Sequence, residues 1–253
     1  MYDLHTHTTL SDGKNTVEEL VEQAKINKYT AIAITDHVDE YNYQKVLLYL
    51  LRQCSIMPKN NELLVLAGIE LTGINPNKIA RVAKAARKLG AQIIIVHGET
   101  TKESVIPGTN RAAVECEEID VLAHPGLISN ELGKIAKQTG VHLEITARKF
   151  HSLTNGHVAK VGLKEGACLI VNSDAHKKED LLTVDKARKI AISSGLSKAE
   201  ALKTLVTNPE LIIKKTLKKE KMKINLSIIL PFLFGTFFHY RFRRCLEWQV
   251  FHF

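Results

Sequence analysis

The sequence predicts an α/β domain built on parallel strands, and two observations support this prediction. Short apolar runs alternate with amphipathic helical patterns from the start of the chain to about residue 213. The runs AIAIT, IIIV and CLIV are continuously apolar, as expected for strands that are covered on both faces. Regular alternation of strand and helix implies parallel strands joined by helical crossovers.

Seven strands are expected, and the helices between them carry start and stop signals. The strands are predicted at Tyr2–His5, Ala31–Thr35, Leu63–Ile69, Gln92–His97, Ile119–Ala123, Val141–Thr146 and Ala167–Asn172. Thr16 and Glu19 form a capping box at the start of a predicted helix over Val17–Lys28. A second helix over Lys78–Leu89 is expected to stop at Gly90. These signals fix the order of the elements along the domain.

The chain divides by composition into a domain over residues 1–213 and an extension over 214–253. The extension holds 9 Lys/Arg and 2 Asp/Glu, which leaves 26 basic and 25 acidic residues of the totals of 35 and 27 in the domain. A domain with a net charge of +1 does not favour nucleic-acid binding. Asn208-Pro209 is expected to end the last helix of the domain.

The extension contains the uncharged run INLSIILPFLFGTFF after a basic segment. At 15 residues it is shorter than the roughly 20 that a membrane-spanning helix needs. Two interpretations are open, contact with an anionic membrane surface or a poorly ordered, non-native extension. We favour the second interpretation because the composition changes so abruptly.

The cysteines and the start of the chain predict a reducing, cytoplasmic setting. Cys54, Cys116, Cys168 and Cys245 are scattered and form no CxxC pair. The chain begins with a predicted strand and has no basic segment followed by an apolar signal sequence. The sequence carries no signal for an oligomeric state.

Metal-type ligands stand at the carboxyl ends of six of the seven predicted strands. His5 and His7 are two residues apart on a strand and therefore point to one face, and Asp174 and His176 repeat this spacing. The full candidate set is His5, His7, Asp12, His37, Glu70, His97, His124, Asp174 and His176. Clustered imidazoles and carboxylates would be costly without a cation, so we predict a metal site.

The position of these ligands favours a barrel over an open sheet. An open sheet gathers its ligands at one switch point, whereas a barrel brings every strand end to one mouth. The sequence contains neither GxGxxG nor GxxxxGK[ST], which argues against a nucleotide-binding sheet.

The motifs HTHTTLSDG, ITDH, GIE, VHG, AHP and NSDAH, in this order, resemble those of the PHP (polymerase and histidinol phosphatase) metallohydrolases. The resemblance covers about residues 1–210 and implies a distorted seven-stranded, TIM-like (β/α)7 barrel that holds two or three divalent ions, commonly zinc, manganese or iron. It implies three ligand groups: His5, His7, Glu70 and Asp174; Glu70, His97 and His124; and Asp12, His37 and His176. Family members often have His at the position of Asp12, which bears on the affinity of the third group.

This resemblance implies hydrolysis of a phosphoester by a hydroxide that bridges ions roughly 3.5–4 Å apart. The loop after the strand that lacks a usual ligand offers Arg148, Lys149 and His151 for binding phosphate. Arg111 is a second anion-binding candidate near a helix start. Asp36 either orients a ligand or caps a strand-end turn.

We therefore predict a phosphatase that acts on a small phosphomonoester, and the resemblance suggests histidinol phosphate or a similar compound. Three alternatives stay open: a phosphodiesterase for nucleotides or nucleic acids, an amidohydrolase, and a non-catalytic, metal-stabilised binding module. The neutral domain disfavours the nucleic-acid substrate, and His97 in IIIVHGE stands where amidohydrolases commonly have a bridging lysine. The complete ligand set disfavours the binding module.

Overall fold

Parallel strands form the centre of the fold, in the order that the sequence predicts. The computed structural model describes residues 1–57 and 63–218. Within these residues the sheet runs β1-β2-β4-β5-β6-β7-β8, and β3 pairs beside this path with β4. The strands are β1 (Tyr2–Asp3), β2 (Ala31–Ile34), β3 (His37–Val38), β4 (Leu64–Leu71), β5 (Ile93–His97), β6 (Val121–Ala123), β7 (His142–Thr146) and β8 (Leu169–Asn172). The seven predicted strands are confirmed, whereas β3 was not predicted.

The first and last strands meet and nearly close the sheet into a barrel. Just beyond them Thr6 forms a parallel bridge with Ala175, and the His7 amide donates to the Ala175 carbonyl at 2.8 Å. The Leu4 amide also donates to Asn172 Oδ1 at 2.9 Å. The distorted barrel of seven parallel strands is therefore confirmed, and the carboxyl ends of its strands meet at one mouth.

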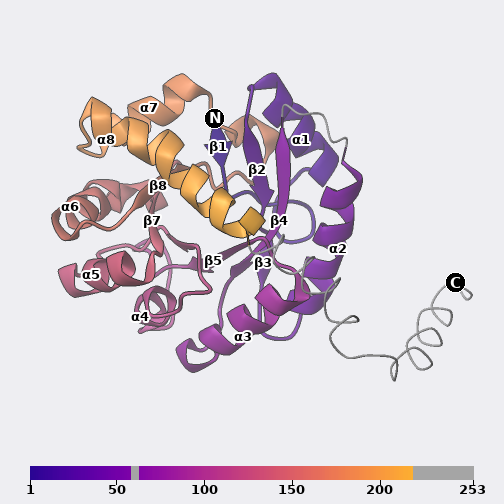
Figure 1. Cartoon of the computed structure of the whole chain (residues 1–253), viewed down its shortest axis with the longest axis horizontal. Helices are drawn as coiled ribbons and strands as arrows, with labels where there is room; N and C mark the ends of the chain where they lie inside the picture. Colours follow the sequence, from indigo (N-terminus) through magenta and orange to yellow (C-terminus); the bar gives the residue numbers. More distant parts are fainter. Residues whose placement is uncertain (58–62, 219–253) are drawn as a thin grey trace, which may run out of the picture. The chain divides into compact units, whose positions relative to one another are not determined.

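Helices surround the strands (Figure 1) and account for the continuous apolar character of the strands. They are α1 (Val17–Ile26), α2 (Tyr43–Ile56), α3 (Pro76–Leu89), α4 (Thr109–Val114), α5 (Asn130–Thr139), α6 (Asn155–Glu165), α7 (Val184–Ser193) and α8 (Lys198–Leu202), with 3-10 turns η1 (His151–Thr154) and η2 (Lys178–Asp180). The predicted capping box of Thr16 and Glu19 is present at α1, and α3 ends at Gly90 as predicted.

Two buried hydrophobic clusters lie between the strands and the helices. One includes Val82 of α3 and Val96 of β5, and the other includes Leu20 of α1, Ile32 of β2 and Leu50 of α2. All five side chains are almost completely buried. Burial of a side chain of this size contributes about 1.5–3 kcal/mol, so these layers hold the strand ends in place.

The predicted helix end at Asn208-Pro209 is wrong. A π-helical turn, η3 (Lys203–Thr207), precedes the proline, and the Asn208 amide donates to the Lys203 carbonyl five residues back. Residues 208–212 remain helical. Proline lacks the N–H of a regular turn, and the wider π turn just before it rearranges the hydrogen bonds so that the helix continues.

The chain separates by its contacts into two units, Met1–Ile212 and Ile213–Phe253. Residues 213–218 of the second unit are described and are helical. The apolar run on which the two interpretations of the extension depend lies outside the described residues. Among the residues that the structure describes, no helix combines the length and hydrophobicity needed to cross a bilayer.

Candidate metal centre

The structure brings all nine candidate ligands to the mouth of the barrel. His5 and His7 follow β1, Asp174 and His176 follow β8, and the bridge between these two segments places them side by side. The other strands contribute His37 at the start of β3, Glu70 near the end of β4, His97 at the end of β5 and His124 just after β6. The unpredicted strand β3 pairs His37 directly with Glu70. Residues far apart in sequence therefore form one cluster.

Glu70 lies at the centre of this cluster. Its Oε2 is 2.8 Å from His37 Nδ1, 3.3 Å from His5 Nε2 and 3.5 Å from His7 Nε2. Its Oε1 is 3.3 Å from His97 Nδ1 and 3.8 Å from His124 Nε2. Each carboxylate oxygen thus faces a different set of imidazoles, which is the arrangement that a bridging carboxylate requires.

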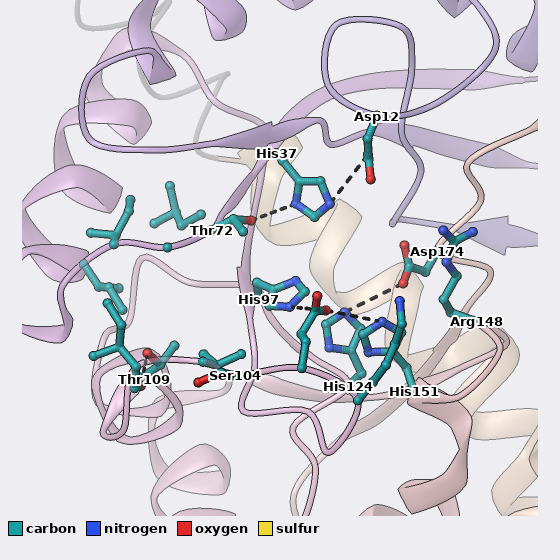
Figure 2. A pocket seen from close by; sticks show the side chains of 18 of the residues that line it. Asp12, His37, Thr72, His97, Ser104, Thr109, His124, Arg148, His151 and Asp174 are labelled. Carbon is teal, nitrogen blue, oxygen red and sulfur yellow. Dashed lines mark hydrogen bonds and ion pairs between the residues drawn. The ribbon is translucent and has the colours of Figure 1, made fainter.

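Asp174 and Asp12 extend the cluster in two directions. Asp174 Oδ1 is 3.2 Å from His7 Nε2, and Asp174 Oδ2 is 3.7 Å from His124 Nε2. At the outer edge, Asp12 Oδ2 is 3.0 Å from His176 Nε2 and Asp12 Oδ1 is 3.7 Å from His37 Nε2. We call His5, Glu70 and Asp174 the inner group, and Asp12, His37 and His176 the outer group. Figure 2 shows Asp12 beside His37, and Asp174 near His124.

Three sets of side chains each bring their ligand atoms within 4.8 Å of one another. They are His5, His7 and Asp174; His7, Asp12, His37 and His176; and His37, Glu70 and His97. These sets overlap strongly with the three groups that the family resemblance implies. They differ in that His37 also approaches Glu70, whereas His124 belongs to none of the compact sets.

The donor atoms of the cluster fit divalent ions. Within the described part of the chain, several of its buried polar atoms have no hydrogen-bond partner: His5 Nε2, both ring nitrogens of His7, both carboxylate oxygens of Glu70, His97 Nδ1 and His124 Nδ1. Leaving buried polar atoms unsatisfied costs about 1–3 kcal/mol each. Imidazole nitrogens and carboxylate oxygens together suit zinc, manganese and iron.

The protonation equilibria of the cluster are set by burial and by the neighbouring carboxylates and imidazoles. Burial opposes protonation of His5, yet Glu144, Glu70 and Asp174 raise its pKa well above the ordinary value. Burial, reinforced by His97, lowers the pKa of His124 well below its ordinary value. His124 is thus held in the neutral form that binds metals, while the carboxylates around His5 attract a cation.

Two candidate ligands have strained backbones. His124 and Asp174 adopt positive φ angles of 26° and 52°. Residues other than glycine rarely occupy this left-handed region, and they cluster at functional sites when they do. The barrel holds both side chains toward the cluster at this cost, which is consistent with a functional arrangement.

Glu144 on β7 supports the cluster by holding His5, and it is not among the site residues predicted from the sequence. Its Oε1 accepts hydrogen bonds from His5 Nδ1 and Asn172 Nδ2, both at 2.8 Å, and its Oε2 accepts from the His124 amide at 3.1 Å. The carboxylate fixes the proton of His5 on Nδ1 and leaves Nε2 facing Glu70. The signal was available in the sequence, because Glu144 is an acidic residue between apolar neighbours on a predicted strand.

Asp36 organises a loop. Among the described residues, its side chain forms no hydrogen bond or ion pair with His37. It accepts hydrogen bonds from the Thr8 amide at 2.8 Å and hydroxyl at 2.7 Å, and from the Ser11 hydroxyl at 2.6 Å. The same loop closes at Gly13, where a Cβ atom would collide with the His7 carbonyl. Of the two interpretations of Asp36, the structure favours the turn cap, which positions the loop that carries Asp12.

A cavity of about 260 Å³ opens over the cluster. Arg148 and His151, two of the residues predicted to bind phosphate, line it. His151 is buried, its Nδ1 lies 2.8 Å from Thr100 Oγ1, and its ring centroid is 4.2 Å from that of His124. In Figure 2 Arg148 lies beside Asp174 at one side of this cavity.

The structure does not bring Arg111 or Lys149 into this cavity. The Arg111 guanidinium pairs with Glu131 at 2.8 Å and Glu115 at 3.2 Å, on the outward face of α4. The Lys149 ammonium lies 5.0 Å from the centre of the Phe150 ring and lines a neighbouring cavity. Glu103, which was not predicted, does line the central cavity, with Oε1 3.3 Å from His97 Nε2 and 3.6 Å from His151 Nε2. No pattern in the loop sequence distinguishes Glu103.

Comparison with known sequences identifies related proteins. The sequence profile described as PHP domain matches residues 3–118. Uncharacterized protein MJ1295 of Methanocaldococcus jannaschii is 39% identical over 219 residues, covering 85% of this chain and 99% of that protein. Ribonuclease P protein component 3 of Methanosarcina barkeri is 31% identical, covering 85% and 89%. A protein named probable phosphatase from Caldicellulosiruptor saccharolyticus is 27% identical, covering 74% and 85%.

Solved structures with the same fold have lower sequence identity. A chain in the cryo-EM structure of archaeal ribonuclease P with mature tRNA superposes with a TM-score of 0.64 at 18% identity, covering 85% of this chain and 91% of that chain. Histidinol phosphate phosphatase from Lactococcus lactis, crystallised with zinc, L-histidinol and phosphate, superposes with a TM-score of 0.56 at 15% identity, covering 78% and 94%. At these identities the similarity establishes the fold.

Proposed function

Since this chain belongs to the PHP domain family, we propose that it is a metal-dependent phosphoesterase that hydrolyses a small phosphomonoester. The observation that carries the proposal is the convergence of nine ligand-type side chains around Glu70, with buried ring nitrogens and carboxylate oxygens left without hydrogen-bond partners among the described residues. Buried polar atoms without partners are costly unless a cation binds them, so this cluster is suited to hold metal ions.

We assign three ion positions to the cluster. His5, His7, Glu70 and Asp174 would hold one ion, Glu70 with His97 and His124 a second, and the outer group a third. When bound, such ions supply a nucleophilic water at neutral pH and neutralise charge on the phosphoryl group. Zinc, manganese and iron all suit these donors.

The chain itself contributes binding and orientation of the phosphoester. Arg148 offers the paired N–H donors of its guanidinium to phosphate oxygens at one side of the cavity. Its Nη1 lies 3.7 Å from Asp180 Oδ2, with which it forms an ion pair. His151 lies over His124 and has its Nδ1 engaged by Thr100, so Nε2 is the ring atom that can reach a substrate. Both residues follow β7, the strand that provides Glu144 in place of a ligand.

The test is a metal-resolved phosphatase assay on the full chain. Protein loaded with zinc, manganese or iron is assayed with p-nitrophenyl phosphate, histidinol phosphate and bis(p-nitrophenyl) phosphate, with metal content measured on the same samples. We expect turnover of monoesters, with histidinol phosphate as the first natural substrate to examine. Faster hydrolysis of the diester would replace the proposal by phosphodiesterase activity. No turnover by fully metallated protein would indicate a metal-stabilised binding module.

Arg148 gives a specific prediction within this function. Replacing it with alanine removes one cation from the cavity and none of the assigned ligands, so we expect KM for a monoester to rise roughly tenfold while metal content stays constant. Lys149→Ala, which removes a neighbouring cation outside the central cavity, is the matched control. Unchanged kinetics of Arg148→Ala would exclude this residue from phosphate binding.

A second candidate function comes from the relatives named ribonuclease P protein component 3, one of which is 31% identical. Under this function the chain would bind RNA as a protein subunit. The net charge of +1 over residues 1–213 counts against it. Mobility-shift titrations with ribonuclease P RNA and with a control RNA of equal length would decide, because only a subunit would prefer the former.

We also propose that the protein works in a reducing compartment such as the cytoplasm. Cys54, Cys116 and Cys168, the described cysteines, are free thiols in the structure.

A further inference from the structure

The loop between β5 and α4 carries a carboxylate into the central cavity. Glu103 lies on this loop, and its side chain is 47% exposed. Its Oε1 is 3.3 Å from His97 Nε2 and 3.6 Å from His151 Nε2. Among the described residues, Glu103 forms no ion pair with a lysine or an arginine. The carboxylate therefore faces two imidazoles, one of which belongs to an assigned metal ligand.

The two ring nitrogens of His97 have different surroundings. Nδ1 lies 3.3 Å from Glu70 Oε1, and the same oxygen is 3.8 Å from His124 Nε2. Within the part of the chain that the structure describes, this Nδ1 is buried and has no hydrogen-bond partner. Nε2 meets Glu103 instead. Nδ1 is therefore the nitrogen available to the ion position formed by Glu70, His97 and His124, while Nε2 faces outward.

His5 shows the same division between its two nitrogens, with their identities exchanged. Glu144 Oε1 lies 2.8 Å from His5 Nδ1, and His5 Nε2 is 3.3 Å from Glu70 Oε2. A carboxylate at the far nitrogen of a metal-binding imidazole fixes the tautomer and the orientation of the ring, and it makes the ring a more basic ligand. Glu103 occupies the corresponding position at His97, on a partly exposed loop instead of a buried strand.

Hydrogen bonds at its base hold the loop that carries Glu103. Glu99 Oε1 accepts from the amides of Gly108 at 3.1 Å and Asn110 at 2.8 Å, and Asn110 Oδ1 accepts from the Glu99 amide at 2.9 Å. The Asn110 side chain also donates to the Pro125 carbonyl at 2.8 Å, just beyond β6. The two ends of the loop are thus fastened together beside the metal centre, which restrains the position of its tip.

The charge of Glu103 narrows its role. A carboxylate would repel the phosphate group of a substrate, so Glu103 is unsuited to bind that group. The competing partner for this side chain is a cationic group on a substrate. The distances favour the imidazoles, because one carboxylate oxygen lies near both His97 and His151.

We propose that Glu103 is a positioning residue of the metal centre, which keeps the ring proton of His97 on Nε2 and so directs Nδ1 to the ion shared with Glu70 and His124. This inference rests on the proposed function, and specifically on its second ion position. Through the same carboxylate oxygen, the loop after β5 also sets the separation between His97 and His151, which lines the substrate cavity.

The first test measures the zinc affinity of the full chain by competition with a chelator of known affinity. Glu103→Ala should weaken the binding of one ion per chain about tenfold and leave the others unchanged, because it removes the acceptor at His97 alone. Glu103→Gln keeps a carbonyl oxygen that accepts the ring proton, so it should recover most of this loss. Glu115→Ala removes a carboxylate of similar exposure, 51%, outside the central cavity and should weaken no ion. Equal affinities in Glu103→Ala and Glu115→Ala would overturn the inference.

Nitrogen-15 NMR of the histidine rings reads the proposed arrangement directly. In the zinc-loaded protein we expect His97 to bind through Nδ1 and to carry its proton on Nε2. Binding through Nε2 would reject the proposal. The thermal unfolding temperature of the metal-free protein should be the same with and without Glu103→Ala, because the removed side chain is partly exposed on a loop. A lower temperature for the variant would assign Glu103 a structural role instead.

Kinetic measurements separate this inference from the function on which it rests. At limiting zinc Glu103→Ala should lose monoesterase activity, and excess zinc should restore kcat. If KM at saturating zinc rose for histidinol phosphate but not for p-nitrophenyl phosphate, Glu103 would bind a cationic group of the substrate and the inference would be wrong. If the unmodified protein hydrolyses no phosphoester, the phosphoesterase proposal fails, while zinc affinity and NMR still decide the role of Glu103.

Discussion

The inner and outer groups of the metal centre use the same kinds of ligand in different surroundings. Glu70 and His5 of the inner group have fully buried side chains, whereas Asp12 of the outer group is 56% exposed on a loop. Glu144 fixes His5 from behind, and the barrel closure fixes Asp174, but Asp12 depends on a loop held by Asp36 and Gly13. The fold itself therefore builds the inner group, while the outer group is attached to it through a loop.

The difference also appears in the charges of the two groups. Burial would raise the pKa of Glu70, but the nearby His37 and His5 hold it well below the ordinary value. Partial burial likewise opposes ionisation of Asp12, and the imidazoles of His176 and His37 lower its pKa. Glu70 and Asp12 are therefore both ionised at neutral pH, so exposure to water, rather than charge, distinguishes these two carboxylates as ligands.

The largest effect is expected from Glu70→Gln. The amide preserves the size of the side chain but removes the charge that faces imidazoles on both sides, so we expect loss of at least one bound ion per chain. The monoesterase activity should fall by roughly 10³-fold or more. Glu131→Gln, which changes an exposed carboxylate on α5, is the control and should change neither quantity. Full metal content in Glu70→Gln would show that Glu70 does not bridge ions.

A smaller effect is expected from Glu144→Gln. Asn172 Nδ2 donates to one carboxylate oxygen and the His124 amide to the other, so the amide nitrogen of glutamine meets a donor in either orientation. The substitution should weaken metal affinity or activity by about 10–100-fold. Competition with a chelator of known affinity measures this effect, and Asn172→Ala should reproduce part of it. An unchanged affinity would mean that the inner group needs no support from β7.

The ligands of these two groups could be predicted from the sequence where they stand at the ends of strands. The strands with their terminal His, Asp and Glu residues were predictable because continuous apolar runs end where the ligands begin, as at IIIV before His97. The barrel was predictable because six strand ends carry ligands, and a barrel brings all strand ends to one mouth. Glu144 was not predicted because ligands are expected at strand ends, whereas this residue supports them from within β7.

Other features depend on packing that a single sequence does not encode. Strand β3 has two residues, too few for a periodic signal, yet it sets His37 against Glu70. Arg111 was placed near a helix start correctly, but the direction of α4 turns it toward Glu131 and away from the cavity. The neighbouring cavity that Lys149 lines joins α7 to the loop after β7, and no spacing in the sequence links these segments.

The outer group should respond separately to Asp12→Ala. This substitution removes a carboxylate from His37 and His176 without touching the buried side chains, so we expect loss of one ion and retention of the others. Activity should fall by only about tenfold, because the inner ions still supply the nucleophile. Metal analysis of the purified variant measures the stoichiometry. If all ions were lost together, the inner and outer groups would form one cooperative site and not two separable ones.

The smallest effect is expected from Asp12→His. An imidazole at this position offers one ligand atom toward His37 and His176, as a monodentate carboxylate does, and the exposed loop can accommodate the larger ring. We therefore expect the metal stoichiometry of the unmodified protein and activity within about threefold of it, with a shift in preference from manganese toward zinc, since nitrogen donors favour zinc. Parallel loading of Asp12→His and Asp12→Ala with each metal provides the comparison. An Asp12→His variant as deficient as Asp12→Ala would show that the carboxylate contributes its charge, and not merely a ligand atom, to the outer group.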